Sequence, residues 1–140
     1  MILVRSAKAQ GARMPVYGAI DVARHIVTLR FTGETSYAEW EQVMDDILAN
    51  VAYVVGMCVL SDRRAAENIP STQHIRDLVA YLVRHAESFV GCGVAIVART
   101  EVEFGMSRMA EILAEETGVL IRAFHTVDEA RTWLALTHPR

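Results

Sequence analysis

The chain has 140 residues, the length of a single domain, which leaves no room for a two-domain enzyme. Hydrophobic residues make up 52% and charged residues 22% of the sequence, so the chain can bury a core and intrinsic disorder is excluded. The net charge of −3 argues against a strongly basic nucleic-acid-binding protein. No run approaches about 18 apolar residues, so no membrane span is expected.

The chain begins with four apolar residues and continues with a polar, basic stretch that lacks the apolar core of a signal peptide. We expect residues 1–14 to form a flexible tail and residues 15–138 to form one domain. Two strand-like runs at 16–20 and 26–32, separated by a short polar break, then predict a hairpin.

An amphipathic helix is predicted over 36–51, because apolar residues recur at steps of three and four and acidic residues occupy the other side. The hydroxyl of Thr35 or Ser36 can cap its first turn. A nearly continuous apolar run at 54–60 then predicts a strand that helices cover on both faces.

The rest of the chain alternates between helix and strand patterns. The expected elements are a polar loop at 61–70, a helix at 71–88, a strand at 92–98, a helix at 101–117, a strand at 119–124 and a final short helix that a capping box opens at Thr126. In the helix at 101–117, the inward side chains are expected to be Met106, Met109, Ile112 and Leu113.

This order predicts an α/β fold with a mixed five-stranded sheet and about four helices. An antiparallel hairpin starts the sheet, and right-handed parallel β-α-β units complete it. Cys58 and Cys92 both fall in apolar runs and are expected to be buried free thiols, which favours a reducing, cytoplasmic location.

Five stretches of the sequence, together with the order of elements, resemble a known family. They are 59–62, 75–78, 94–97, 104–109 and 123–134. The more specific ones are the helix start at Gly105 to Met109 and the pattern Phe-x-x-x-x-Glu-Ala-x-x-Trp-Leu that begins at Phe124. Over roughly residues 16–136 the chain resembles STAS-like proteins of the SpoIIAA-like branch, relatives of bacterial anti-sigma-factor antagonists.

The resemblance implies a non-catalytic regulatory domain that acts by binding a protein. In antagonist members of the family, a serine directly after an aspartate is phosphorylated at a helix start. Here Ser61 precedes Asp62, so the chain departs from that order. The resemblance still implies phosphorylation candidates near this position, which are Ser61, Ser71 and Thr72.

Ligands of open α/β sheets usually bind at the carboxyl ends of the parallel strands. At that edge, adjacent arginines beside a helix start could hold a phosphate or carboxylate. The candidates for such a site are Asp62, Arg63, Arg64, Ser71, Thr72, Arg99, Thr100 and His125. The alternative, that these residues are solvated loop residues and helix caps, stays open.

No motif predicts catalysis, a cofactor or a metal. The five histidines show no metal-binding spacing, and no Gly-x-Ser-x-Gly elbow presents a nucleophilic serine. We therefore expect a binding domain and not an enzyme. Its partner is an unknown protein or a second copy in a homodimer, and the alternative is a module for a small anionic or amphipathic ligand at the strand ends. Residues 34–62 carry six acidic and no basic residues, which favours a partner with a basic surface.

Overall fold

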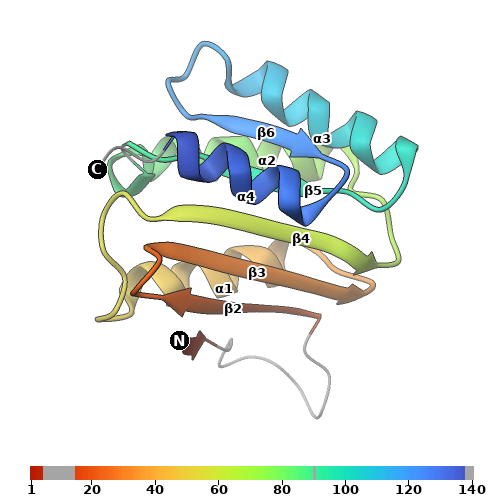
Figure 1. Ribbon diagram of the computed structural model, residues 1–140. Helices are drawn as coiled ribbons and strands as arrows, with labels where there is room; N and C mark the ends of the chain where they lie inside the picture. The colour runs from red at the N-terminus through yellow and green to blue at the C-terminus, as the bar shows by residue number, and fades with distance from the viewer. Residues whose placement is uncertain (5–14, 90, 138–140) are drawn as a thin grey trace.

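Six strands form a single mixed sheet with helices on both faces, as Figure 1 shows. The structure is a computed structural model, and it describes residues 1–4, 15–89 and 91–137. The strands lie in sequence order across the sheet. They are β1 (Ile2–Val4), β2 (Val16–Asp21), β3 (Ile26–Gly33), β4 (Cys58–Ala66), β5 (Val94–Val97) and β6 (Ile121–Phe124).

Strands β1 to β3 pair antiparallel, and β3 to β6 pair parallel, which confirms the predicted hairpin followed by β-α-β units. The prediction of five strands is wrong by one, because Ile2–Val4 pairs with β2 as a sixth strand. A run of three residues is too short for the alternating pattern of a strand to be recognised in the sequence alone. The rest of the predicted tail, residues 5–14, lies outside the described residues.

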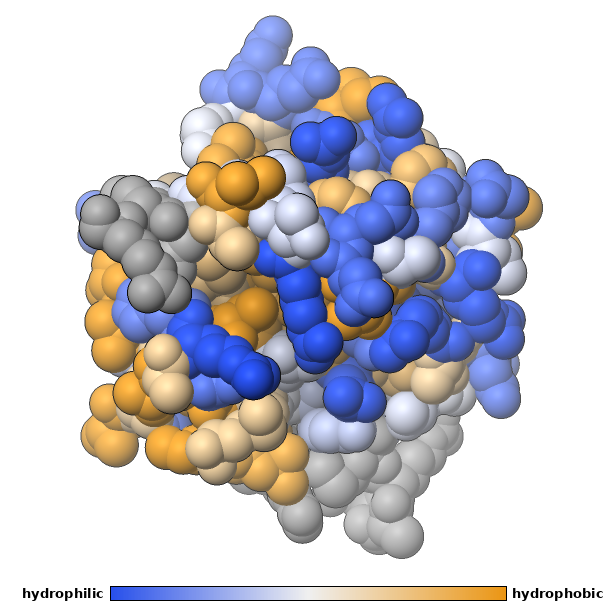
Figure 2. Space-filling view, in the orientation of Figure 1, coloured by the Kyte–Doolittle hydropathy of each residue, from blue (hydrophilic) through white to orange (hydrophobic). Residues whose placement is uncertain are grey.

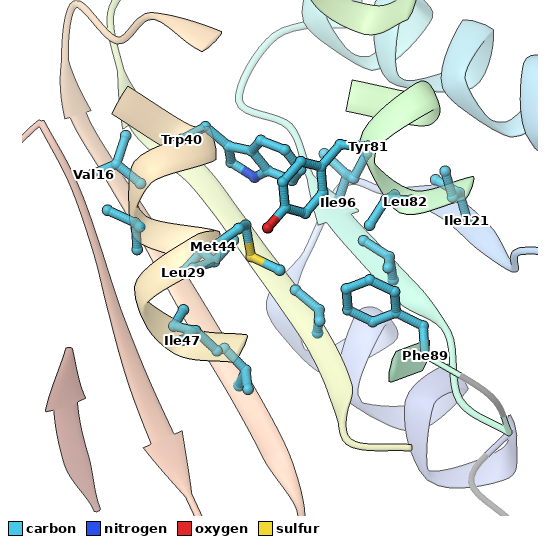
Figure 3. Packing of buried hydrophobic residues seen from close by; sticks show 14 of the residues in the cluster. Val16, Leu29, Trp40, Met44, Ile47, Tyr81, Leu82, Phe89, Ile96 and Ile121 are labelled. Carbon is cyan, nitrogen blue, oxygen red and sulfur yellow. The ribbon is translucent and has the colours of Figure 1, made fainter. Parts of the chain in front are cut away.

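Three helices cover one face of the sheet. They are α1 (Tyr37–Ala49), α2 (Thr72–Arg84) and α3 (Glu101–Ala114), and a short 3-10 helix, η1 (Ala86–Phe89), follows α2. The larger core lies between these helices and the sheet, where Trp40 of α1 meets Tyr81 of α2 edge to face at 5.0 Å (Figure 3). The fourth helix, α4 (Val127–Thr137), packs on the opposite face and buries a smaller core with Ala130 and Leu134.

Local sequence explains where the helices begin. Ser36 and Glu39 form a capping box at α1: the Glu39 amide donates to Ser36 Oγ at 3.2 Å, and the Ser36 amide donates to Glu39 Oε1 at 2.9 Å. At α4 the predicted cap by Thr126 is confirmed, because the Glu129 amide donates to Thr126 Oγ1 at 3.1 Å, and the Thr126 hydroxyl donates to Glu129 Oε1 at 3.0 Å. Glycine is needed at Gly93, where an added Cβ would collide with the Trp133 ring of α4.

Strand β4 departs most from the prediction. The expected strand at 54–60 begins four residues later and continues to Ala66, so Asp62 to Ala66 lie in the strand and not in a loop. Residues Val54 and Val55 are exposed and irregular. The charged end of β4 stays in the sheet because β3 extends alongside it, with Thr32 and Gly33 paired to Ala65 and Ala66.

The two cysteines differ from expectation in one respect. Both are buried, as predicted, but the structure joins Cys58 of β4 and Cys92 by a disulfide. The prediction of free thiols is therefore wrong, and the argument for a reducing compartment that rested on them no longer applies.

Candidate functional site

The edge of the sheet at the carboxyl ends of β4, β5 and β6 holds the predicted site residues. Asp62 of β4 is the register partner of Val97 of β5, and Val97 is the register partner of Phe124 of β6. After Asp62, β4 pairs only with β3. Because side chains alternate between the two faces of a strand, Arg63 faces the side of α1 to α3, whereas Asp62 and Arg64 face the side of α4.

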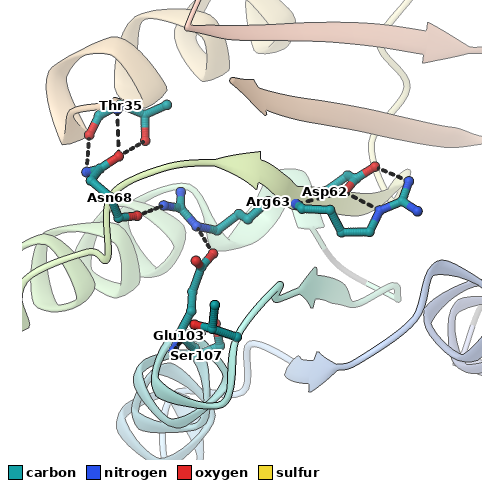
Figure 4. Close-up of polar contacts among 8 residues, drawn as sticks. Thr35, Asp62, Arg63, Asn68, Glu103 and Ser107 are labelled. Carbon is teal, nitrogen blue, oxygen red and sulfur yellow. Dashed lines mark hydrogen bonds and ion pairs between the residues drawn. The ribbon is translucent and has the colours of Figure 1, made fainter. Parts of the chain in front are cut away.

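Arg63 is buried in an ion pair with Glu103 of α3, shown in Figure 4. Its Nε donates to Glu103 Oε1 at 2.8 Å, and its Nη2 donates to the backbone carbonyl of Asn68 at 3.2 Å. The guanidinium carbon also lies 4.6 Å from the centre of the Phe31 ring. Burial lowers the pKa of Arg63, and the carboxylate of Glu103 opposes that shift. Arg63 therefore joins β4 to α3.

Asn68 extends this network to the start of α1. The Thr35 amide donates to Asn68 Oδ1 at 2.8 Å, and Asn68 Nδ2 donates back to the Thr35 carbonyl at 2.8 Å. Arg63, Asn68 and Thr35 thus connect β4 with both α3 and α1. Neither Glu103 nor Asn68 was among the predicted site residues.

Arg64 and Asp62 pair with each other on the opposite face. Arg64 Nη2 lies 2.7 Å from Asp62 Oδ2, and Arg64 Nε donates to Asp62 Oδ1 at 2.9 Å. Burial alone would raise the pKa of Asp62, but the hydrogen bonds and charge of Arg64, with a contribution from Arg30, outweigh it and hold that pKa below its usual value. The two adjacent arginines thus point to opposite faces and do not meet around one anion.

The hydroxyl candidates at this edge are two helix caps, one buried strand residue and Thr72, the exposed first residue of α2. Ser71 caps α2, because its Oγ accepts the His74 amide at 3.0 Å, and Thr100 caps α3, because its Oγ1 accepts the Glu103 amide at 3.2 Å. Ser61 is buried inside β4, whereas Ser71 and Thr72 are exposed. Phosphorylation remains a prediction, and Ser71 and Thr72 are the candidates that a kinase could reach in the folded chain.

His125 follows β6 in the sequence and contacts the first turn of α3. Its ring stacks on Phe104 with the centres 3.9 Å apart, and its Nδ1 lies 3.6 Å from Glu101 Oε1. Arg99 is exposed at the same end of the sheet. Most candidate side chains at this edge therefore contact other residues of the chain. This favours the alternative in which these residues do not form a ligand site.

His74 of α2 is a buried group that the sequence did not single out. Burial lowers its pKa to about 4, and the nearby charge of Arg63 acts in the same direction. The ring lies edge-on to Tyr37 with the centres 5.8 Å apart. His74 is therefore neutral in the folded chain at neutral pH.

The outer face of α3, meaning Val102, Ile112 and Leu113, exposes large apolar side chains. Val102 is 63% exposed and Ile112 is 61% exposed. The prediction that Ile112 and Leu113 face inward is wrong, whereas Met106 and Met109 are half-buried against the core. The helix instead buries Glu103, Ser107, Ala110 and Ala114.

Small side chains explain this orientation of α3. Ser107, Ala110 and Ala114 let the helix lie close to its neighbours α2 and β6, and the ion pair with Arg63 draws Glu103 inward. These four residues recur at steps of four, three and four, which is a helical stripe that the sequence contains but that hydrophobicity alone does not reveal.

The described residues offer neither a metal site nor a membrane helix. Within residues 1–4, 15–89 and 91–137, no three His, Cys, Asp or Glu side chains lie together as metal ligands. In the same ranges, no helix combines the length and the apolar character that crossing a bilayer requires.

Comparisons with known proteins give a likeness of fold. No family model and no curated protein matches the chain. It is similar to the crystal structure of an uncharacterized protein of the DUF3478 family from Shewanella loihica PV-4, which is described as having a SpoIIAA-like fold. The likeness has a TM-score of 0.58 at 16% sequence identity, and it covers 89% of this chain and 98% of the other. The chain therefore has the SpoIIAA-like fold.

Proposed function

We propose that this domain acts without catalysis, by associating with a second copy of itself through the outer face of α3. The observation that carries the proposal is the orientation of α3, which turns Ile112, Leu113 and Val102 toward solvent and small residues toward the core. Exposed apolar side chains gathered on one element are typical of interaction sites.

Gly105 supports the same surface. It lies in the first half of α3, is exposed, and would have no atom within 4 Å of an added Cβ. A glycine inside a helix lowers stability by roughly 0.5–1 kcal/mol relative to alanine. None of the described residues packs so closely that glycine is required there, but a second helix that crosses α3 closely would require it.

A symmetric arrangement suits this surface. In a two-fold dimer the α3 helix of each subunit packs against the α3 helix of the other. The same apolar side chains of both subunits then bury each other, so no second type of binding surface is needed. The site at the strand ends supports this choice over the small-ligand alternative, because Arg63, Arg64 and Asp62 already form ion pairs within the chain.

The test compares the wild-type chain with Ile112→Glu and Leu113→Glu variants by light scattering coupled to size-exclusion chromatography. Val51→Glu is the matched control, because Val51 is fully exposed in the turn after α1 and away from α3. We expect a dimer for the wild type and the control, and a monomer for the α3 variants. A wild-type monomer, or variants that dimerise like the wild type, would contradict the proposal.

A further inference from the structure

A groove of about 510 Å³ opens on the face of the sheet that carries α4. It exists because α4 is narrower than the sheet: α4 packs on β4, β5 and β6, and leaves the same face of β2 and β3 open beside it. Figure 2 shows this side of the molecule, where hydrophilic side chains border a hollow with apolar side chains in its depth. The volume lies within the range of roughly 300–1,000 Å³ that small-molecule sites occupy.

The walls and floor of the groove are largely apolar. Tyr17 and Ala19 of β2 point into it together with Ile26 of β3, because these residues alternate with the buried side chains of the opposite face. Leu134 and Ala135 of α4 form the opposite wall. A ligand in this groove would therefore bury an apolar body between β2, β3 and α4.

Three arginines border the groove, in a chain whose net charge is negative. They are Arg24 in the β2–β3 turn, Arg30 on β3 and Arg131 on α4, against one acidic residue, Asp21. Asp21 lies 3.8 Å from Arg24. In the described part of the chain, the side chains of Arg30 and Arg131 form no hydrogen bond, and Asp62, the register partner of Arg30, is already bound by Arg64.

We propose that this groove binds an amphipathic carboxylate, with its apolar body on the floor and its carboxylate between Arg30 and Arg131. A guanidinium group matches a carboxylate with two parallel hydrogen bonds, and both arginines have free donors. No helix N-terminus lies among the lining residues, although phosphate sites commonly use one, so a single carboxylate fits better than a phosphate. This site adjoins the strand-end candidates at one point only, because Arg30 of β3 is the register partner of Asp62.

Titration calorimetry with the full chain tests the proposal with matched probes. We expect 1-naphthaleneacetate or octanoate to bind, and the neutral analogue 1-naphthaleneethanol and the cation 1-naphthaleneethylamine to bind at least ten times more weakly. Increasing salt should weaken binding of the carboxylate, because solvent reaches the groove. If neither carboxylate binds at millimolar concentration, or if the neutral analogue binds equally well, the proposal is wrong.

Variants locate the bound carboxylate. The double variant Arg30→Gln with Arg131→Gln should lower the affinity at least tenfold, and Ala135→Trp should abolish binding by filling the groove from the exposed side of α4. Arg76→Gln on α2 is the control, because Arg76 is exposed on the other face of the sheet. Circular dichroism confirms that each variant is folded, and unchanged binding by the folded double variant would overturn the assignment.

Discussion

Glu103 is a buried acidic residue whose charge is tolerated because of its ion pair. Its side chain is only 2% exposed, and its carboxylate lies 2.8 Å from Nε of Arg63, whose side chain is 6% exposed. Two buried charges are tolerated only when each is paired and hydrogen-bonded, and the Asn68 carbonyl gives Arg63 a second acceptor. The pair therefore orients α3 on the sheet more than it adds to stability.

Replacing Glu103 with Gln should destabilise the fold, because the guanidinium of Arg63 would remain buried without a counter-charge. We expect a loss of about 3–5 kcal/mol in the free energy of unfolding, measured by urea denaturation. Glu101→Gln is the control on the same helix: Glu101 is 85% exposed, so its substitution should cost less than about 1 kcal/mol. Equal losses for the two variants would show that the Arg63 pair is not buried as described.

His74 makes stability depend on pH. The pKa of His74 is about 4 in the folded chain, where burial and then Arg63 disfavour the charged ring, and it is about 6.5 in the unfolded chain. Between these values the unfolded chain binds a proton that the folded chain does not bind. The free energy of unfolding therefore falls as the pH decreases from 6.5 toward 4.

Between pH 6.5 and pH 5, we expect the wild type to lose roughly 1.5 kcal/mol of stability through this one group. His74→Gln keeps the site neutral and should remove most of that slope, even if its stability at pH 7 is lower. Urea denaturation at several pH values measures both effects. A variant with the same slope as the wild type would exclude His74 as the cause.

At the level of elements, α3 shows how a single buried charge changes which face a helix presents. Hydrophobicity favours the face of Ile112 and Leu113 as the inner one, but packing selects the stripe of Glu103, Ser107, Ala110 and Ala114. The apolar residues left outside are available to a partner.

Gly105→Ala separates helix stability from association. Because nothing lies within 4 Å of the added methyl group, the variant should raise the free energy of unfolding of the monomer by about 0.5–1 kcal/mol. The same methyl group should weaken the dimer, because it holds the two helices apart. Urea denaturation at low concentration and sedimentation equilibrium measure the two effects, and an unchanged dimer dissociation constant would place Gly105 outside the interface.

Local patterns predicted the elements that depend on local physics. Periodicity and caps placed α1 and α4, and apolar runs placed β5 and β6. The patterns could not place the charged end of β4, because that end is held by pairing with β3 and by the ion pair of Arg63 with Glu103, which is 40 residues away. Pairs over such distances leave no local signal.

At the scale of the whole molecule, the sequence predicted the hairpin and the parallel β-α-β units, but not the order of the six strands or the arrangement of the candidate site. The strand-end residues do lie along one edge, but alternation along β4 sends Arg63 to one face and Arg64 to the other. The arginines of the groove, Arg24, Arg30 and Arg131, come from three separate segments, so only the folded sheet brings them to one place.

The two proposed surfaces lie on different layers of the molecule. The outer face of α3 belongs to the layer of α1 to α3, and the groove lies beside α4 on the opposite face of the sheet. A ligand in the groove and a second copy on α3 would therefore not compete for the same side chains.

The most direct test of the central claim, association through the outer face of α3, is sedimentation equilibrium of the unmodified chain between about 1 and 200 μM. The account predicts a mass that approaches twice the chain mass of 15.6 kDa as the concentration rises, and a Leu113→Glu variant that stays at 15.6 kDa. A wild-type mass that remains at 15.6 kDa over the whole range would contradict it.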